Sequence, residues 1–259
     1  MIAVTGQNGD VGSILLGLGA DNGVGFVNID SCSSGSVDFL VHMAAKSPPT
    51  KIEPMIASNV IYTNEVIAKA YNLGIKKALF FSAVSVYGTQ AQENITEDAP
   101  LCKPDYYGAT KYLAEKLFAE SALDTICLRL PAVLGYKNNT NIIARLYNRL
   151  KNGEAITLFN ADRIFNNFID VESIFKFITT VDIAKDFDTL NLAARQEVTL
   201  YEIVLFMKDL LSSDSSIVCL SEPKSFFNIS TKKAQEYYGF TPPSPYEILA
   251  KWVERELKI

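Results

Sequence analysis

The stretch that decides the fold is MIAVTGQNGDVGSILL, residues 1–16. Its apolar start, Ile2 to Val4, predicts a buried strand, and the residues from Ser13 onward predict a helix. Between them, glycines allow a tight turn and a close approach of the backbone to a pyrophosphate, while the helix N-terminus offers free N–H groups. The pattern predicts a dinucleotide site, with a tight strand-to-helix turn as the alternative. The residues expected to line the site are Gly6, Gln7, Asn8, Gly9, Asp10, Val11 and Gly12.

Outward from this loop, short apolar runs alternate with longer helical patterns. That order predicts parallel strands joined by crossover helices, and the runs are continuously apolar, as in strands covered on both faces. The predicted strands are Ile2 to Val4, Gly25 to Ile29, Phe39 to Met43, Ala78 to Phe81, Thr125 to Leu130 and Thr189 to Leu192. The predicted helices are Pro54 to Leu73, Tyr107 to Leu123 and Val171 to Thr180. We therefore expect an α/β protein with a Rossmann-like, doubly wound parallel sheet.

The C-terminal part predicts a smaller lobe that binds substrate. Thr199 and Ser244 each stand three residues before a glutamate, and both capping boxes predict the start of a helix. The polar segment Gly135 to Thr140 follows a strand and predicts the departure toward this lobe. We assign residues 1–135 plus about 168–193 to the dinucleotide-binding domain, and about 136–167 plus 194–259 to the substrate-binding lobe.

Asp30 ends the second predicted strand, where a carboxylate would accept hydrogen bonds from the adenosine ribose. It would also repel a 2′-phosphate, and no Lys or Arg precedes Lys46 in the sequence, so NAD is favoured over NADP. A solvated Asp at a strand end is the alternative.

Few residues separate Asp30 from Asp38, where the next strand begins, and a crossover helix does not fit there. We expect a bare strap and a sheet that lacks its usual outer strand.

The composition excludes several function classes. The 259 residues carry 24 Lys and Arg against 29 Asp and Glu, a net charge of −5, with no basic block for nucleic acid or an anionic membrane. We find no targeting signal and no apolar run near ~18 residues, and we expect a cytoplasmic protein. Four scattered cysteines, Cys32, Cys102, Cys127 and Cys219, lack metal-site spacing, so we expect no metal and reduced, buried thiols.

Tyr107 and Lys111 stand four residues apart at the start of a predicted helix, which places the phenol and the ammonium on one face. A tyrosine accepts a proton at neutral pH only where its phenolate is stabilised, and a cation one turn away does so. The spacing alone also fits an amphipathic surface pair. The Tyr107–Lys111 spacing is a specific signal of a catalytic pair only together with the glycine loop.

Taken together, these motifs resemble the extended short-chain dehydrogenase/reductases, the group of NAD-dependent sugar epimerases and dehydratases. The resemblance runs nearly end to end. It rests on Thr5 to Gly12, Val41 to Ala45, Asn59 with Thr63 and Asn64, Val86 to Gly88, Tyr107 to Lys111, Leu128 to Pro131, Phe168 to Val171 and Phe227 to Ala234.

The resemblance implies a role for each matching residue. The glycine loop would hold the pyrophosphate of NAD, and Asp30 its ribose. Tyr107 would take a proton from a substrate hydroxyl while hydride passes to the nicotinamide, and Lys111 would bind the nicotinamide ribose and lower the pKa of the phenol. Other residues expected beside the cofactor are Ala44, Ala45, Lys46 and Pro131.

The chain departs from the family pattern beside the tyrosine of Val86-Tyr87-Gly88. Ala83 stands where the family usually has a Ser or Thr that bonds the reacting oxygen. Ser82 and Ser85 flank it and are candidates to replace that hydroxyl, with plain loop serines as the alternative. Val84 and Ser85 stand where 4,6-dehydratases have an Asp-Glu pair. Because valine transfers no proton, dehydration by that route is disfavoured.

The second departure concerns the substrate phosphates. The phosphate-binding arginine of the family falls on Asn166, and a neutral amide binds phosphate less strongly than a guanidinium. Arg163 lies nearby and is a candidate to replace it, with an ordinary surface arginine as the alternative. The candidates for contacts with substrate are therefore Ser82, Asn141, Arg163 and Asn166.

Other conspicuous residues are interpreted as structural. The single histidine, His42, lies in an apolar strand and is expected in the core. Tyr237, Tyr238 and Trp252 follow helical spacing and are expected to pack. Asn59 matches a family residue that bridges backbone groups.

The sequence thus predicts an NAD-dependent epimerase or oxidoreductase that acts on a nucleotide-activated sugar. The alternative is a binding protein of the same fold, a regulator or partner subunit with weak or lost chemistry, which Ala83, Asn166 and the missing strand favour. The resemblance also implies a homodimer in which Pro54 to Leu73 and Tyr107 to Leu123 form a four-helix bundle with a second copy.

Overall fold

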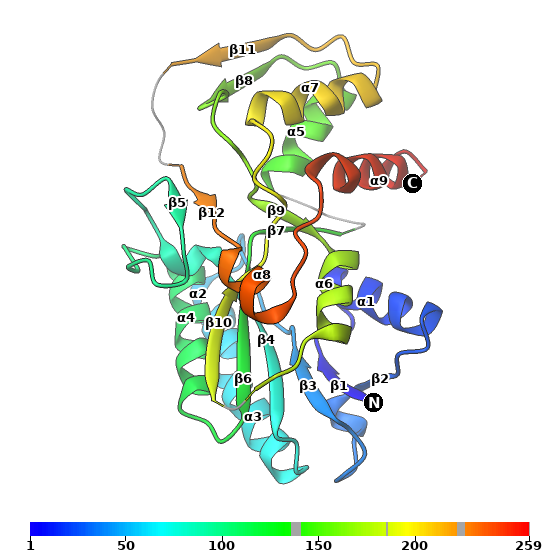
Figure 1. Cartoon of the computed structure of the whole chain (residues 1–259), viewed down its shortest axis with the longest axis vertical. Helices are drawn as coiled ribbons and strands as arrows, with labels where there is room; N and C mark the ends of the chain where they lie inside the picture. Colours follow the sequence, from blue (N-terminus) through cyan, green and yellow to red (C-terminus); the bar gives the residue numbers. More distant parts are fainter. Residues whose placement is uncertain (136–140, 185, 222–225, 259) are drawn as a thin grey trace.

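The computed structural model of the chain describes residues 1–135, 141–184, 186–221 and 226–258. Its centre is a six-stranded parallel sheet in the order β10-β6-β4-β3-β1-β2, seen at the lower end of the molecule in Figure 1. All six predicted strands are present. They are β1 (Ile2–Thr5), β2 (Phe26–Asn28), β3 (Phe39–His42), β4 (Lys77–Ala83), β6 (Asp124–Leu130) and β10 (Phe187–Asn191).

Helices cover both faces of this sheet, which explains the continuous apolar runs. One face packs on α1 (Asp10–Asp21) and α6 (Val171–Thr180). The other packs on α3 (Tyr62–Asn72) and α4 (Tyr106–Ala119). Successive strand residues alternate between the two cores: Leu79 and Phe81 face the first, and Ala78 and Phe80 face the second. Because the strand period is two, both alternating sets of residues face a core, and such a strand is largely apolar along its whole length.

The predicted helix Pro54 to Leu73 is a continuous helical stretch with a local change of pitch. It begins as α2 (Ile52–Ile56), passes through a π-helical segment (Ala57–Ile61) and continues as α3. Such bulges are often found at functional sites. Here the π-helical segment carries the buried Asn59, whose contacts are described below.

The connection between β2 and β3 is a strap, as predicted. It contains a single 3₁₀ turn, Ile29–Ser31, and returns so that the Asp38 N–H donates to the carbonyl of Met1. No outer strand pairs with β2 among the described residues, and β2 is the edge of the sheet. The strap packs on the end of α3 instead, where the Gly35 N–H donates to the carbonyl of Leu73.

A second group of elements lies above the sheet in Figure 1 and has its own buried core. It comprises α5 (Ile142–Lys151), α7 (Leu200–Leu210), α9 (Pro245–Leu257) and the paired strands β8 (Ile156–Phe159) and β11 (Ile217–Leu220). Short pairs join the two regions: β7 (Ala132–Leu134) with β9 (Phe168–Asp170), and β5 (Asn94–Ile95) with β12 (Asn228–Ile229). The following helix α8 (Lys232–Tyr238) contacts β10 of the main sheet. Of the departure predicted at Gly135 to Thr140, residues 136–140 lie outside the described residues.

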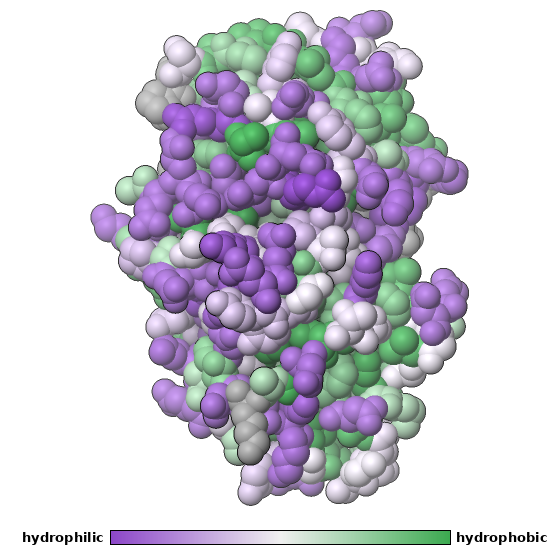
Figure 2. All heavy atoms as spheres, viewed as in Figure 1, coloured by the Kyte–Doolittle hydropathy of each residue, from purple (hydrophilic) through white to green (hydrophobic). Residues whose placement is uncertain are grey.

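On the face drawn in Figure 2, hydrophilic residues gather across the middle of the molecule.

The exposure of the cysteine thiols differs from the prediction. Only Cys127 is buried, Cys32 is half-buried, and Cys102 and Cys219 are exposed; all four are free. Tyr237 is 75% exposed, so it does not pack as predicted, whereas Trp252 is buried.

Only one of the two predicted capping boxes forms. The Thr199 hydroxyl accepts a bond from the Glu202 N–H, and Glu202 accepts from the Thr199 N–H. Helix α9 does begin at Pro245, but the Ser244 hydroxyl makes no cap and donates to Glu197 Oε1 at 3.0 Å. The Ser244 hydroxyl is therefore directed toward a neighbouring carboxylate and not toward the helix amides.

Thr199→Ala should lower the free energy of unfolding by about 1 kcal/mol, because it removes an N-cap acceptor. Ser244→Ala is the matched control and should cost less, since no helix amide loses a partner. Urea unfolding of both variants measures the difference. Equal losses would contradict the capping assignment.

Candidate functional site

The glycine loop lies at the carboxyl end of β1 and is closed by backbone contacts. A Cβ on Gly6, whose φ is +76°, would lie 2.7 Å from the backbone nitrogen of Ala44. A Cβ on Gly12 would lie 2.2 Å from the carbonyl oxygen of Gly6. Both positions therefore require glycine. Helix α1 begins within this stretch, at Asp10 and not at Ser13 as predicted, and Gly9 provides no side-chain cap. The loop thus leaves helix N–H groups available to an anion, which fits a dinucleotide.

The other predicted loop residues lie along this turn. Asn8, Gly9 and Asp10 are exposed, and Gln7 and Val11 are partly exposed. The carboxylate of Asp10 lies beside Gly135, where a Cβ would be 2.8 Å from Oδ2. Gly135 follows β7, so the loop faces the point at which the chain leaves the sheet.

Asp30 lies at the carboxyl end of β2, in the 3₁₀ turn of the strap, and its side chain is 63% exposed. Its Oδ1 forms an ion pair at 2.6 Å with Nζ of Lys69 on α3. The sequence has no Lys or Arg near Asp30 in the chain, and none before Lys46. In the structure, a lysine 39 positions away partly neutralises this carboxylate.

Hydrogen bonds connect the glycine loop to α4. The Ala44 N–H donates to Thr5 Oγ1 at 3.2 Å, and the Lys46 N–H donates to Asn59 Oδ1 at 2.7 Å. The Asn59 amide donates in turn to the Lys46 carbonyl and to Thr110 Oγ1 on α4. Asn59 therefore bridges backbone groups, as predicted, and it fixes the first turns of α4 at the edge of the sheet that carries the glycine loop.

Tyr107 lies in the first turn of α4. Asp105 caps this helix by accepting from the Gly108 N–H. Burial, together with the Asp105 carboxylate, raises the pKa of Tyr107 to about 12. At neutral pH the phenol therefore holds its proton and can donate it.

Lys111 lies one turn later, on the buried face of α4, and is 1% exposed. Its Nζ is 4.2 Å from the centre of the Phe80 ring. Burial lowers the pKa of this amine to about 7, against opposing effects of Cys127 and Glu115. The expected lowering of the Tyr107 pKa is not seen in this arrangement. The spacing of four does place both residues on one side of α4. That side faces the sheet, however, and the Lys111 amine contacts the Phe80 ring and does not lower the pKa of the Tyr107 phenol.

His42 is a core residue, as predicted. Its ring nitrogens lie 2.6 Å from Thr5 Oγ1 and 2.8 Å from Thr63 Oγ1. Burial, with a contribution from the charge of Lys111, lowers the His42 pKa to about 3, so the imidazole is neutral. The neutral ring therefore keeps one N–H proton, bears no charge at neutral pH, and holds β1 and α3 together through its two nitrogens.

Ser82 and Ser85 differ sharply in their surroundings. Ser82 is buried, and its hydroxyl donates to Glu115 Oε1 at 2.5 Å. Ser85 lies in the 3₁₀ turn Val84–Tyr87 and is partly exposed. Its carbonyl would be 2.2 Å from a Cβ on Gly108, which places Ser85 beside the first turn of α4. Of the two serines, Ser85 is thus the one whose backbone adjoins the first turn of α4, which carries Tyr107.

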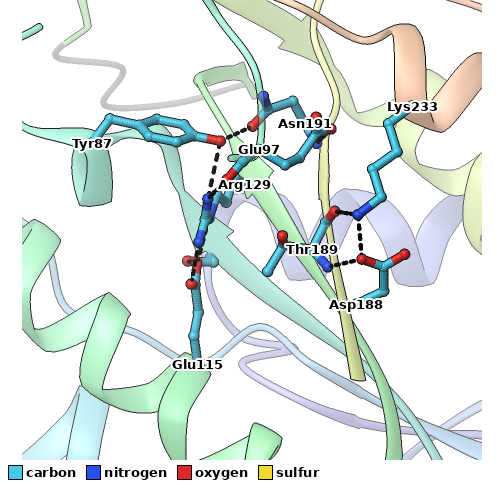
Figure 3. A network of polar contacts seen from close by, with 9 residues as sticks. Tyr87, Glu97, Glu115, Arg129, Asp188, Thr189, Asn191 and Lys233 are labelled. Atoms are coloured by element: carbon cyan, nitrogen blue, oxygen red, sulfur yellow. Dashed lines mark hydrogen bonds and ion pairs between the residues drawn. The ribbon is translucent and has the colours of Figure 1, made fainter. Parts of the chain in front are cut away.

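A buried polar network, drawn in Figure 3, was not predicted. Arg129 donates through Nε and Nη2 to the two oxygens of Glu115, and through Nη1 to Tyr87 Oη and the Glu97 carbonyl. Tyr87 donates to Asn191 on β10. An arginine inside the apolar strand Thr125 to Leu130 was the available signal. The network fixes α4 against three strands, and burial raises the pKa of Tyr87 to about 12.

The residues expected to bind substrate are not all available. Asn166 is fully buried: its amide donates to the carbonyls of Ala194 and Ile229 and accepts from the Ile229 N–H. The prediction that Asn166 contacts substrate is therefore contradicted by its geometry, because backbone groups occupy the amide. Asn141 caps α5 by accepting from the Ala144 N–H. Arg163 is paired with Glu93.

Two cavities lie near these residues. One, of about 540 Å³, is lined by Arg163, Tyr201 and Cys219 among others. The other, of about 360 Å³ between α5 and β8, is lined by Arg145, Arg149, Phe159 and Phe226 among others. The second cavity combines cations with aromatic rings, which suits a nucleoside phosphate.

No helix in the described part of the chain is long and apolar enough to cross a membrane. Within the same residues, no group of three or more His, Cys, Asp or Glu side chains could hold a metal ion.

The sequence profile of the NAD dependent epimerase/dehydratase family matches residues 27–192, more than half of the chain. The chain belongs to this family. The match confirms the predicted family. It also confirms the predicted cofactor, because the enzymes of this family depend on NAD. It begins after the glycine loop, whose assignment therefore depends on the geometry described above.

Relatives of this NAD dependent epimerase/dehydratase chain include two proteins described as UDP-glucose 4-epimerases. The one from Halalkalibacterium halodurans is 31% identical over 115 residues, covering 41% of this chain and 34% of that protein. The one from Azospirillum brasilense is 26% identical over 171 residues, covering 52% of this chain and 49% of that protein. The chain thus matches less than half of the length of either relative.

Solved structures share the fold over the whole chain. MoeE5 in complex with UDP-glucose and NAD gives a TM-score of 0.81 at 21% identity and covers 99% of this chain and 98% of that one. A UDP-glucose 4-epimerase with UDP-glucose from Thermotoga maritima gives a TM-score of 0.80 at 19% identity. The alignment covers 99% of this chain and 98% of that one. At these identities the likeness confirms the predicted α/β architecture with its parallel sheet.

Gly12→Ala should weaken NADH binding at least tenfold, because the added methyl group would displace the loop carbonyl of Gly6 and move the helix N-terminus. Gly17→Ala, on the same helix with no atom within 4 Å of an added Cβ, is the matched control and should bind normally. Fluorescence titration with NADH checks both. Normal binding by Gly12→Ala would remove the loop from the cofactor site.

Lys111→Met should raise the free energy of unfolding at pH 7 by roughly 2–4 kcal/mol, because a pKa lowered from 10.5 to about 7 means that burial of the charge opposes folding. The unfolded chain binds more protons between these values, so the wild-type penalty is largest at and below pH 7. The difference should vanish near pH 10.5. Denaturant unfolding at both pH values measures it.

Lys116→Met is the control for this lysine, since Lys116 is an exposed residue of the same helix. It should change stability little at either pH. A loss of stability in Lys111→Met at pH 7 would show that the amine makes net stabilising contacts.

Proposed function

We propose that the chain is an NAD-dependent epimerase or oxidoreductase acting on a nucleotide-activated sugar. The observation that carries the proposal is the bridge made by Asn59. It connects the turn after β3 to Thr110, so that Tyr107 stands at the same sheet edge as the glycine loop. In parallel α/β sheets, ligands bind at the carboxyl ends of the strands. A proton donor and a dinucleotide cradle are therefore neighbours.

The residues that would hold NAD form a continuous set around this edge. The glycine loop would bind the pyrophosphate through backbone N–H groups, and Asp30 would bind the adenosine ribose. Bound NAD supplies acceptance and return of a hydride. The remaining residues proposed beside it are Ala44, Ala45, Lys46, Tyr107, Lys111 and Pro131.

Proton transfer would be carried by the phenol oxygen of Tyr107. Its raised pKa keeps the proton in place at neutral pH, which suits donation to a carbonyl oxygen as that group is reduced. For the reverse step the phenol must lose its proton, and Lys111 could assist by turning its amine from Phe80 toward the ribose side. Ser85, whose backbone adjoins the first turn of α4, is the proposed replacement for the hydroxyl missing at Ala83, whereas Ser82 is held by Glu115.

The nucleotide part of the substrate would occupy the cavity between α5 and β8. Arg145 and Arg149 line it together with Phe159 and Phe226. Arginine binds phosphate oxygens well, and aromatic rings bind a base. Asn166 is held by backbone groups and Arg163 is paired with Glu93. Arg149 is also paired, with Glu154 at 3.5 Å, and would have to share its guanidinium with a phosphate. Relatives described as UDP-glucose 4-epimerases support a sugar substrate.

A second function is favoured by specific observations: a dinucleotide-binding regulator or partner subunit with weak chemistry. Ala83 removes one hydrogen-bond donor, and the loss of such a donor costs a factor of about 10² to 10³ in rate. Ser82 cannot replace it without breaking its bond to Glu115. The cofactor cradle is intact in this case as well.

We also propose a homodimer formed through α2, α3 and α4. Ile56 on α2, Ile61 in the π-helical segment and Leu113 on α4 are exposed apolar side chains, and α4 contacts both of the other elements. A molar mass near twice that of the 28.6 kDa chain in sedimentation equilibrium tests it. A cytoplasmic location stays a prediction.

Tyr107→Phe should reduce turnover by about 10² to 10⁴, the range of general acid–base catalysis, while NADH affinity changes little. Tyr106→Phe is the matched control, since Tyr106 adjoins it but is 70% exposed, and should keep wild-type turnover. A panel of nucleotide sugars with NAD, followed by NMR for epimers and by absorbance for NADH, provides the readout. Turnover that survives in Tyr107→Phe would refute the assigned role. NADH binding without any turnover of the panel by the wild type would establish the second function.

A further inference from the structure

The ion pair between Asp30 and Lys69 bears on which dinucleotide the site accepts. Asp30 follows β2, next to the strand that carries the glycine loop, where the adenosine ribose would lie. A lone carboxylate there binds the two ribose hydroxyls of NAD and repels the 2′-phosphate of NADP. Here the carboxylate is not alone, because Lys69 Nζ lies 2.6 Å from Oδ1.

The fold itself brings the two residues together. Sheets of this class usually continue beyond β2 with a helix and an outer strand. This chain replaces them with the strap, which packs directly on the end of α3 through Gly35 and Leu73. Lys69 on α3 can therefore reach the carboxyl end of β2.

Both partners keep free capacity. Asp30 Oδ2 has no hydrogen-bond partner in the described part of the chain, so it can still accept from a ribose hydroxyl. An ammonium has three N–H donors, and one is directed at Oδ1. Lys69 is 39% exposed, which leaves its other donors accessible to a ligand.

The strap adds groups that suit a phosphate. Ser31 and Ser33 follow Asp30 directly and are exposed, and no acidic residue occurs between Asp30 and Asp38. Hydroxyl donors and small residues are what a phosphate monoester requires beside a cation. The other acidic group close by is Glu65, one turn before Lys69 on α3; its charge and that of Asp30 both contribute to raising the pKa of Tyr62.

We propose that Lys69 is a coenzyme-specificity residue which, by pairing with Asp30, lets this site bind NADP(H) as well as NAD(H). The inference rests on the proposed function, since it requires the glycine loop to bind a dinucleotide. In NAD, Asp30 Oδ2 accepts from the diol. In NADP, the 2′-phosphate binds the remaining donors of Lys69 and the strap hydroxyls.

Direct titration of the full chain with NADH and NADPH, followed by fluorescence, tests the proposal without an activity assay. Wild type should bind the two with dissociation constants within about tenfold of each other. Lys69→Met should weaken NADPH at least tenfold and NADH less than threefold. Asp30→Asn should weaken NADH and retain NADPH, because the repelling charge is gone.

Lys76→Met, which removes another exposed lysine, is the matched control and should change neither affinity. Thermal unfolding of each variant shows that the fold is kept, as expected for an exposed ion pair. More than tenfold preference of the wild type for NADH, or an equal loss of both ligands in Lys69→Met, would overturn the proposal. If neither dinucleotide binds the wild type, the proposed function fails, and this inference with it.

Discussion

The buried ion pair between Glu115 and Arg129 is the interaction on which the geometry of the site depends. Both side chains are almost inaccessible to water, at 2% and 6% exposed. Removing two charges from water is unfavourable unless their hydrogen bonds are satisfied, and removing one partner of such a pair costs about 3–5 kcal/mol. Here both oxygens of Glu115 are bonded, and Arg129 also holds Tyr87. The pair therefore fixes the rotation of α4 against the sheet.

That rotation has opposite consequences for the two residues of the YxxxK motif. Tyr107 lies in the first turn of α4, which the Asn59 bridge connects to the turn after β3. Lys111, one turn on, is carried onto the covered side of the helix and lies over Phe80. The same contacts explain why Ser82 is not available to a substrate, since its hydroxyl belongs to the Glu115 network. The two residues of the motif thus differ in environment, since Tyr107 is partly exposed and Lys111 is 1% exposed.

The strap after β2 is the other feature that sets this chain apart. Shortening the connection removes the outer strand and leaves β2 at the edge of the sheet. The end of α3 fills the space, and its Lys69 neutralises Asp30. Because the likeness to solved structures of the family extends over the whole chain, the change is local. It alters the charge around Asp30 and leaves the glycine loop after β1 in place.

The sequence by itself determined the strands, the glycine loop and the family. Strands covered on both faces are largely apolar, and α6 begins and ends where its pattern predicts, at Val171 and Thr180. Short-range geometry of this kind depends on neighbours in the chain. Only the tertiary structure decided the partners of Asp30 and Asn166, which come from 39 and as many as 63 positions away. A polar side chain takes the partner that packing brings to it, and no spacing in the sequence encodes that approach.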